Sequence, residues 1–238
     1  MEGIIDIHNH IIFGVDDGAK NIEEALEIIE EEYNQGVRKI ICTPHFQGGV
    51  YEAKPEEIQK KFHMIRECVK EKYSDLELYK GNEILLSGNI SELLKTKRVC
   101  QLADSRYILV EFTQGVEYSV LETKIRDVLL EGYIPIIAHC ERYTCLQKSV
   151  DRIEHLVEVG AYMQINAKTA LTFKGRRFIK KLIDADCLHF IASDAHGIKK
   201  RGVHFNECVT LLEKKYGKEY VRWLLIENPQ KILDNRYI

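Results

Sequence analysis

The sequence predicts an α/β protein whose parallel strands close into a barrel. Amphipathic helical segments alternate with short, often β-branched, apolar runs along the chain. The runs are apolar at almost every position, which is typical of parallel strands that are covered on both faces. Because no run has the polar face of an edge strand, a closed (β/α) barrel is favoured over an open sheet.

Seven apolar runs are predicted as strands. In chain order they cover residues 4–7, 37–42, 76–79, 107–110, 134–138, 162–165 and 188–192. Three helical segments end at a glycine directly before a strand, as in βαβ units. These glycines are Gly36, Gly132 and Gly160. Asn21 and Glu24 form a cap pair that predicts the start of the first helix, and further helices are expected over 54–72, over 174–185 and in the tail from Val203.

Length and composition predict one globular domain over residues 1–238. Acidic and basic residues are interspersed and the net charge is −3, so a nucleic-acid partner is not expected. The chain has no apolar run of about 20 residues and no secretion signal at its start, so neither membrane insertion nor export is expected. Seven irregularly spaced cysteines suit free thiols in the cytoplasm. The sequence leaves an oligomer possible.

Metal-ligand side chains follow the carboxyl end of almost every predicted strand. In a parallel barrel these ends meet at one mouth, so residues far apart in the sequence are expected to converge. His8 and His10 are two residues apart, which places both imidazoles on one side of an extended strand, and Asp194 with His196 repeats this spacing. The predicted ligands are His8, His10, Asp17, His45, Glu83, Glu111, His139, Asp194 and His196. They are too many for one four-coordinate ion, so two or three ions are expected.

The alternative for any single histidine is a packed or solvated side chain. That interpretation is preferred for the four histidines outside the strand ends, His63, His155, His189 and His204. A charged residue at a strand end can also cap a turn or a helix, which is the interpretation of Asn9 and the alternative for Asp17. Capping does not explain HxH and DxH at opposite ends of the strand order.

Such a site suits phosphoryl transfer, because neighbouring divalent ions activate water and clamp the attacking and leaving oxygens. Two arginines, Arg142 and Arg201, follow ligand positions and are predicted to bind the phosphate. Surface charge is the alternative for each of them.

Cys100 and Arg106 match the C-x5-R spacing of cysteine-dependent tyrosine phosphatases. The segment between them has no glycine, carries Asp104 where backbone amides should bind an anion, and leads into a strand. We therefore expect no cysteine nucleophile. The chain also has no G-x-S-x-G elbow, GxGxxG fingerprint or P-loop.

Eight short motifs together carry a family resemblance. They lie at residues 6–10, 15–18, 43–45, 82–83, 111–112, 138–143, 192–196 and 227–229. As a set they resemble the polymerase-and-histidinol-phosphatase (PHP) superfamily and, within it, the bacterial capsule and exopolysaccharide-type tyrosine-protein phosphatases. The resemblance implies a single-domain, distorted (β/α)7 TIM-like barrel with parallel strands, the PHP fold.

The resemblance also implies three divalent metal ions, most often manganese, with iron or zinc as alternatives. The implied ligand sets are His8, His10, Glu83 and Asp194 for one ion, Glu83, Glu111 and His139 for a second, and Asp17, His45 and His196 for a third. Glu83 would bridge two ions and is counted with Arg142 and Arg201 as catalytic. The implied reaction is in-line attack of metal-bound hydroxide on phosphotyrosine. The implied substrate is the tyrosine-rich tail of a bacterial tyrosine kinase of polysaccharide synthesis.

Two other functions stay open. A small-molecule phosphatase of the histidinol phosphate type would share the metal ligands and differ in its substrate pocket. A non-catalytic metal-binding or docking module would keep the ligands without turnover. A phosphodiesterase is disfavoured by the lack of basic tracts, and a metal-dependent deaminase by Glu111, where many relatives use lysine.

Overall fold

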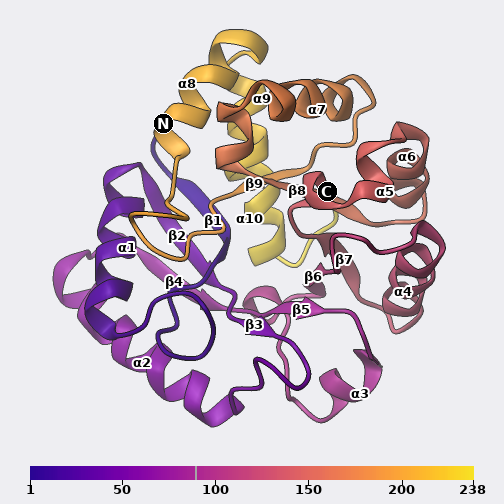
Figure 1. The fold of residues 1–238 in the computed structure, drawn as a ribbon. Helices are drawn as coiled ribbons and strands as arrows, with labels where there is room; N and C mark the ends of the chain where they lie inside the picture. The colour runs from indigo at the N-terminus through magenta and orange to yellow at the C-terminus, as the bar shows by residue number, and fades with distance from the viewer. Residues whose placement is uncertain (89) are drawn as a thin grey trace.

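A computed structural model describes residues 1–88 and 90–238, in which helices surround a strongly curved parallel sheet (Figure 1). The strands are β1 (Ile4–Asn9), β2 (Val37–Cys42), β3 (His45–Phe46), β4 (Glu77–Lys80), β5 (Glu83–Leu85), β6 (Tyr107–Glu111), β7 (Ile134–Ile137), β8 (Tyr162–Asn166) and β9 (Phe190–Ala192). The helices are α1 (Ile22–Asn34), α2 (Pro55–Lys72), α3 (Ile90–Lys95), α4 (Tyr118–Leu130), α5 (Thr144–Gln147), α6 (Val150–Glu158), α7 (Phe173–Asp184), α8 (Phe205–Tyr216), α9 (Lys218–Arg222) and α10 (Asn228–Leu233). Short 3-10 turns lie at η1 (Leu102–Asp104), η2 (Cys140–Arg142) and η3 (Ala167–Leu171), and a π turn, η4 (Trp223–Glu227), joins α9 to α10.

All strand pairs in the described residues are parallel, and they form two ladders, β1-β2-β4 and β3-β5-β6-β7-β8-β9. Two backbone hydrogen bonds connect the two ladders. Gly81 N donates to the carbonyl of Cys42, and Glu83 N donates to the carbonyl of Pro44. A bridge between Asn9 and Ala195 joins the first strand to the segment after β9. The result is a distorted barrel with seven strand positions, two of them interrupted. The prediction of a parallel α/β barrel is confirmed.

The apolar core has two parts, one inside the barrel and one between the strands and the outer helices. Ile5, Ile7, Leu109 and Phe190 pack inside the barrel, where Ile232 of α10 joins them. The larger cluster joins the outer faces of the strands to the helices. The barrel interior is therefore filled, as in other (β/α) barrels, and leaves only its mouth for chemistry.

Helix starts and stops follow the local sequence. The side chain of Asn21 accepts a hydrogen bond from Glu24 N at 2.9 Å, so the predicted cap is present. The Glu24 carboxylate accepts from Lys20 N instead of returning to Asn21, which leaves the cap pair one-sided. Gly36 follows α1 with φ +94°, a backbone conformation that favours glycine.

A β-bulge in β1 aims the first ligand. Asp6 pairs with Ile40 and Asn9 with Cys42, so three steps along β1 match two along β2. Ile7 already points into the barrel, and regular alternation would turn His8 away from it. The extra residue of the bulge turns His8, and His10 two residues later, toward the barrel mouth. The two imidazoles share a side because of their two-residue spacing, and their Nε2 atoms lie 3.3 Å apart.

Asn9, interpreted as a cap from the sequence, is neither in a turn nor at a helix end. It is fully buried as the last residue of β1, and its side chain donates to the Asp6 carboxylate.

No helix of the described residues is long and apolar enough to cross a membrane.

Burial makes His189 a source of pH-dependent stability. Its Nδ1 accepts a hydrogen bond from Met163 N at 3.1 Å, and burial lowers the pKa of the imidazole to about 4 from 6.5. The folded chain keeps His189 neutral while the unfolded chain binds a proton below pH 6.5, so stability is lost as the pH falls from about 6.5 to about 4.

His189→Gln should remove this contribution. The difference in free energy of unfolding between the wild type and the variant should shrink by up to about 1.4 kcal/mol per pH unit across that window. Urea unfolding at pH 7, 6 and 5 measures it. Parallel stability curves for the two proteins would show that His189 titrates normally in the folded state.

Candidate metal centre

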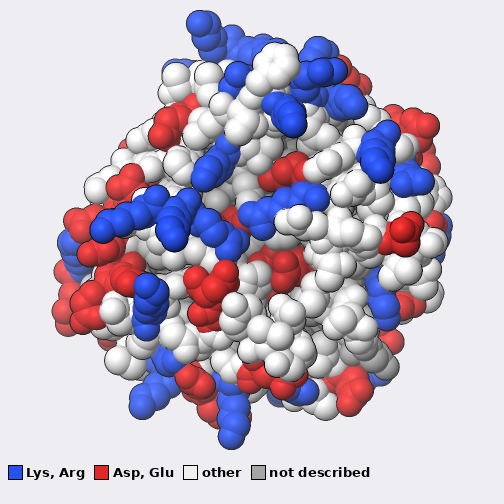
Figure 2. Space-filling model, viewed as in Figure 1, with Lys and Arg blue, Asp and Glu red and all other residues white. Residues whose placement is uncertain are grey.

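The structure brings the nine predicted ligands together at the carboxyl ends of the strands. The contacts form one network that runs from Asp17 through the histidines to Glu111. Figure 2 shows this face as a hollow with acidic side chains at its base and basic side chains along its border. The scatter of the nine residues in the sequence is therefore a consequence of the barrel topology.

Three groups of side chains at this mouth could each hold a metal ion. One contains His8, His10, Glu83 and Asp194, a second His45, Glu83 and Glu111, and a third His10, His45 and His196. In each group the donor atoms lie within 4.8 Å of one another. Glu83, His10 and His45 each belong to two groups, and Glu83 is the one carboxylate among them.

These groups agree in part with the ligand sets that the family resemblance implies. The first set is the same. His139 is outside the groups, although its Nε2 lies 2.7 Å from Glu83 Oε1 and 3.7 Å from Glu111 Oε2. Asp17 is also outside them, with Oδ1 3.3 Å from His196 Nε2 and 3.5 Å from His45 Nε2. The assignment of all nine side chains as ligands stays a prediction.

Buried atoms without a hydrogen-bond partner fit the presence of cations. Among the described residues, three of the buried side-chain atoms that lack a hydrogen bond lie in the cluster: His45 Nδ1, Glu83 Oε2 and His196 Nε2. Leaving such atoms unpaired costs free energy. Cations would pair with them in two of the groups, His45 and Glu83 in one and His196 with His45 in another. Imidazole and carboxylate donors together suit manganese, iron or zinc.

Neighbours on the far side of each ring orient four of the imidazoles. His10 Nδ1 lies 2.8 Å from Asp16 Oδ2, and His8 Nδ1 lies 3.1 Å from Gln164 Oε1. His139 Nδ1 lies 3.2 Å from the hydroxyl of Tyr143, and His196 Nδ1 lies 3.0 Å from a backbone carbonyl. In all four, Nε2 is left to face the cluster, which is the arrangement that fixes the tautomer of metal-bound histidine.

Sequence reasoning missed these orienting residues. Asp16 was passed over for its neighbour Asp17, yet the Asp16 side chain is fully buried and Asp17 is about half exposed. The doubled aspartate in Val15–Gly18 was the available signal. The sequence has no comparable signal for Gln164 or Tyr143, because a glutamine in a strand and a tyrosine in a turn are common in any barrel. Gln164 Oε1 also accepts from His139 N at 2.8 Å.

Electrostatics holds Glu83, Asp194 and His196 in the protonation states that cations need, whereas the carboxylates around His8 and His10 raise the pKa of both imidazoles, so a cation must displace their protons. Burial alone would raise the pKa of Glu83, but His8, His139 and His45 lower that pKa well below its ordinary value. Burial likewise opposes ionisation of Asp194, whose pKa His8, His10 and Arg142 hold well below the ordinary range. Burial and His10 lower the pKa of His196 to about 4, so this imidazole is neutral at pH 7.

Two predicted ligands have a left-handed backbone. His139 has φ +34° and Asp194 has φ +53°, a region that is unfavourable for residues other than glycine. The amide of each is held by a hydrogen bond, from His139 to Gln164 and from Asp194 to the carbonyl of His8. Strain of this kind is common where a side chain must be aimed at a functional site.

Both predicted phosphate-binding arginines lie against the cluster. Arg142 Nη2 donates to Asp194 Oδ2, and Arg201 donates to Asp194 Oδ1 at 2.9 Å and to Asp17 Oδ2 at 3.2 Å. Each side chain is about one-third exposed, at 33% and 35%. The guanidinium groups therefore join the ligands to the open side of the hollow, where an incoming anion would meet them.

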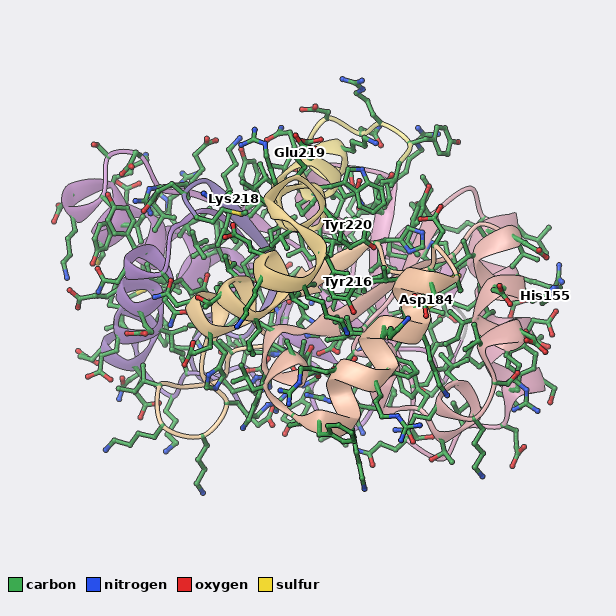
Figure 3. The ribbon with its side chains drawn as sticks, turned by 90° about the horizontal axis from the view of Figure 1, so that it is seen from above. His155, Asp184, Tyr216, Lys218, Glu219 and Tyr220 are labelled. Carbon is green, nitrogen blue, oxygen red and sulfur yellow. The ribbon has the colours of Figure 1, made fainter. Side chains whose placement is uncertain are left out.

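Other candidate groups lie outside the cluster. His63, His155 and His204 are on outer helices or at a helix end, with His155 at the outer edge of the molecule in Figure 3, and His189 is packed in the core. Burial raises the pKa of Cys100 to about 11, and its thiol donates to Asn82. Arg106 instead binds Asn235 and Tyr237 near the carboxyl terminus. The C-x5-R match therefore forms no anion site.

A parallel barrel with these groups at its mouth defines a class: (β/α)-barrel proteins with a cluster of histidine and carboxylate side chains able to bind metal ions. The family described as capsular polysaccharide synthesis, CpsB/CapC, matches residues 4–234. The chain therefore belongs to the CpsB/CapC family, and the predicted resemblance is confirmed.

Relatives cover the chain almost completely. It is 36% identical to the tyrosine-protein phosphatase CpsB of Streptococcus pneumoniae, over 99% of this chain and 100% of that protein. It is 34% identical to the tyrosine-protein phosphatase YwqE of Bacillus subtilis, over 99% and 93%. A solved structure from work on YwqE and CpsB, described as unique metal-dependent tyrosine phosphatases, matches with a TM-score of 0.90 and 34% identity over 99% and 96% of the two chains.

Asp16→Asn should weaken metal binding although Asp16 is no predicted ligand. Asp16 Oδ2 accepts from His10 Nδ1 and Oδ1 accepts from Gly18 N, and an amide has only one oxygen to serve both, so the ring is held less firmly. We expect metal affinity to fall by about 10- to 100-fold. Titration against a competing chelator measures it, with Asp151→Asn on α6 as the matched control. Equal affinity in both variants would show that Asp16 does not orient the ligand.

Cys100→Ser should leave phosphatase activity unchanged, because a buried thiol with a pKa of about 11 supplies almost no thiolate at pH 7. Turnover of p-nitrophenyl phosphate measures this. An inactive serine variant that unfolds at the wild-type urea concentration would reassign the mechanism to Cys100.

Proposed function

We propose that this chain is a metal-dependent protein-tyrosine phosphatase, with residues 1–238 as one catalytic domain. The observation that carries the proposal is the meeting of nine histidine and carboxylate side chains and two arginines at one barrel mouth. Membership of the CpsB/CapC family supports it, because relatives that cover the whole chain are tyrosine-protein phosphatases.

We propose three divalent ions, most often manganese, held by the nine residues predicted from the sequence. Iron and zinc fit the same donors. When bound, such ions supply Lewis-acid activation of water and neutralise the charge of the phosphoryl oxygens. Glu83 would contribute to two of the sites, since its carboxylate belongs both to the group with His8, His10 and Asp194 and to the group with His45 and Glu111.

The chain's own residues bind and orient the phosphate. Arg142 and Arg201 exchange part of their contact with Asp194 for the non-bridging oxygens, and both keep a charge at all relevant pH values. Asp16, Gln164 and Tyr143 hold the imidazole rings in position. No side chain of the described site is placed to act as a cysteine or serine nucleophile.

The proposed substrate is the phosphotyrosine-rich tail of a bacterial tyrosine kinase of polysaccharide synthesis. The family's description as capsular polysaccharide synthesis proteins supports this choice. The proposed location is the cytoplasm, in keeping with seven cysteines that all lack a disulfide.

Metal removal tests the proposal. After chelation and gel filtration the protein should lose turnover of p-nitrophenyl phosphate and of a phosphotyrosyl peptide, and Mn²⁺ should restore both. His139→Ala should lose at least about 100-fold in kcat/KM, while His155→Ala, on the outer face of α6, should match the wild type. Unchanged turnover after stripping, or in His139→Ala, would exclude a metal-dependent hydrolase. A preference for histidinol phosphate over the peptide would overturn the substrate assignment.

A further inference from the structure

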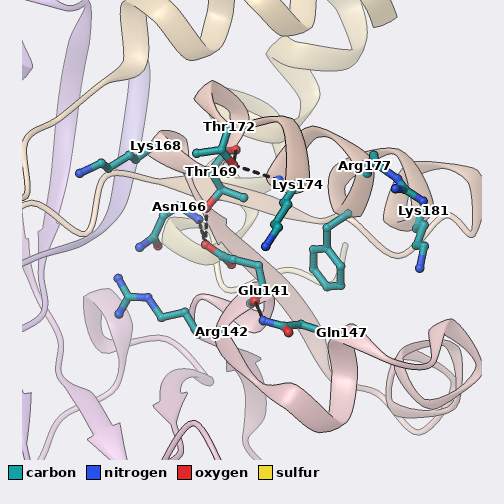
Figure 4. Close-up of a pocket in the computed structure, with 12 residues that line it drawn as sticks. Glu141, Arg142, Gln147, Asn166, Lys168, Thr169, Thr172, Lys174, Arg177 and Lys181 are labelled. Carbon is teal, nitrogen blue, oxygen red and sulfur yellow. Dashed lines mark hydrogen bonds between the residues drawn. The ribbon is translucent and has the colours of Figure 1, made fainter.

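A basic pocket lies beside the metal centre. It has a volume of about 570 Å³ and lies between the η2–α5 turn and the start of α7 (Figure 4). Five cationic side chains line it, Arg142, Lys168, Lys174, Arg177 and Lys181, against one carboxylate, that of Glu141. The pocket therefore carries a strong excess of positive charge on a chain whose net charge is −3.

The pocket and the metal centre share a wall. Arg142 lines the pocket and donates to Asp194 Oδ2. Asn166 also lines it, and its Nδ2 donates to the same oxygen at 2.7 Å. Asp194 is a predicted metal ligand, so the pocket and the metal centre are separated by the side chains of Arg142 and Asn166.

Most of the pocket's cations have no acidic partner. Within the described residues, Lys174, Arg177 and Lys181 form no ion pair, and all three are exposed. Lys168 Nζ donates only to the carbonyl of Lys200. The neighbouring Lys180, which does not line the pocket, is paired with Asp184, which is labelled in Figure 3. Outside the pocket, Arg176 of the same helix also has no carboxylate partner, but its guanidinium donates to the carbonyls of Ala170 and Leu171.

The one carboxylate in the pocket is already used. Glu141 Oε1 accepts from Asn166 N at 3.0 Å and from Thr169 Oγ1 at 2.6 Å, which fixes the pocket wall. Arg142 is paired with Asp194, so the pocket holds four further lysine or arginine charges against the single carboxylate of Glu141, an excess of three.

The start of α7 breaks a local rule of helix stability. Its first turn has no acidic residue and contains Lys174, with Arg176 and Arg177 following. Cations near a helix N-terminus are unfavourable, because they face the positive end of the helix dipole. A bound anion would reverse this cost, and such departures from local preference are common at functional sites.

We propose that this pocket binds a second phosphotyrosine of the same substrate chain while the first lies at the metal centre. The inference rests on the proposed function. An aromatic phosphate fits because the pocket combines its cations with the ring of Phe178 and has room for a phenyl phosphate group. The enzyme would then prefer multiply phosphorylated tails over singly phosphorylated ones.

Binding of peptides that cannot be hydrolysed tests the proposal separately from catalysis. Three fluorescent peptides carry phosphonomethyl-phenylalanine at one position, at two positions, or at one position with glutamate at the second. The Mn²⁺-loaded wild type should bind the doubly substituted peptide about tenfold more tightly than the other two. Lys174→Gln/Lys181→Gln should bind all three alike.

Lys180→Gln/Lys214→Gln is the matched control, because it removes two exposed lysines outside the pocket and should keep the tenfold preference. Turnover of p-nitrophenyl phosphate should be equal in all three proteins. Equal binding of the peptides by the wild type, or a preference that survives Lys174→Gln/Lys181→Gln, would overturn the second site. If the glutamate peptide bound as tightly as the doubly substituted peptide, the pocket would accept any acidic side chain and would not be specific for phosphotyrosine. Failure of the wild type to hydrolyse p-nitrophenyl phosphate would instead count against the proposed function alone.

Discussion

One buried carboxylate organises the site, because Glu83 contacts four of the five clustered imidazoles. Its Oε2 lies 3.1 Å from His8 Nε2, 3.3 Å from His10 Nε2 and 3.0 Å from His45 Nδ1, and its Oε1 lies 2.7 Å from His139 Nε2. Removing a carboxylate from water is costly unless positive charge or strong donors replace the solvent. Imidazoles and arginines at the mouth of the barrel supply positive charge and hydrogen-bond donors around Glu83. In our account, divalent cations supply the rest.

The distortions of the barrel lie where the ligands lie. The bulge in β1 precedes His8, the break between β2 and β3 precedes His45, and the break between β4 and β5 precedes Glu83. A regular barrel would distribute side chains evenly between its interior and its helices. In the irregular stretches the side chains do not alternate strictly, so side chains from separate strands can meet at the mouth. These stretches lose some hydrogen bonds between strands, and the apolar packing inside and outside the barrel offsets that loss.

Much of the fold and of the cluster could be predicted from the sequence, because both follow from patterns. The runs that become β1, β2, β6, β7 and β8 are rich in apolar residues, and parallel strands must end at one mouth. β3 and β5 have two and three residues, too few for any periodicity, so the sequence could not reveal the interruptions. The choice between Asp16 and Asp17 depends on the path of the loop, and the pocket beside Arg142 depends on α7 packing next to the η2 turn. Both depend on tertiary packing, which leaves no recognisable pattern in the local sequence.

The most direct test of the account is anomalous X-ray diffraction from crystals grown with Mn²⁺, recorded on both sides of the manganese absorption edge. The account predicts strong anomalous peaks at the barrel mouth, at least one of them within coordinating distance of both Glu83 and an imidazole. An ordered Glu83 with no anomalous peak near it, or manganese bound only elsewhere on the molecule, would contradict the claim that this carboxylate organises a metal centre.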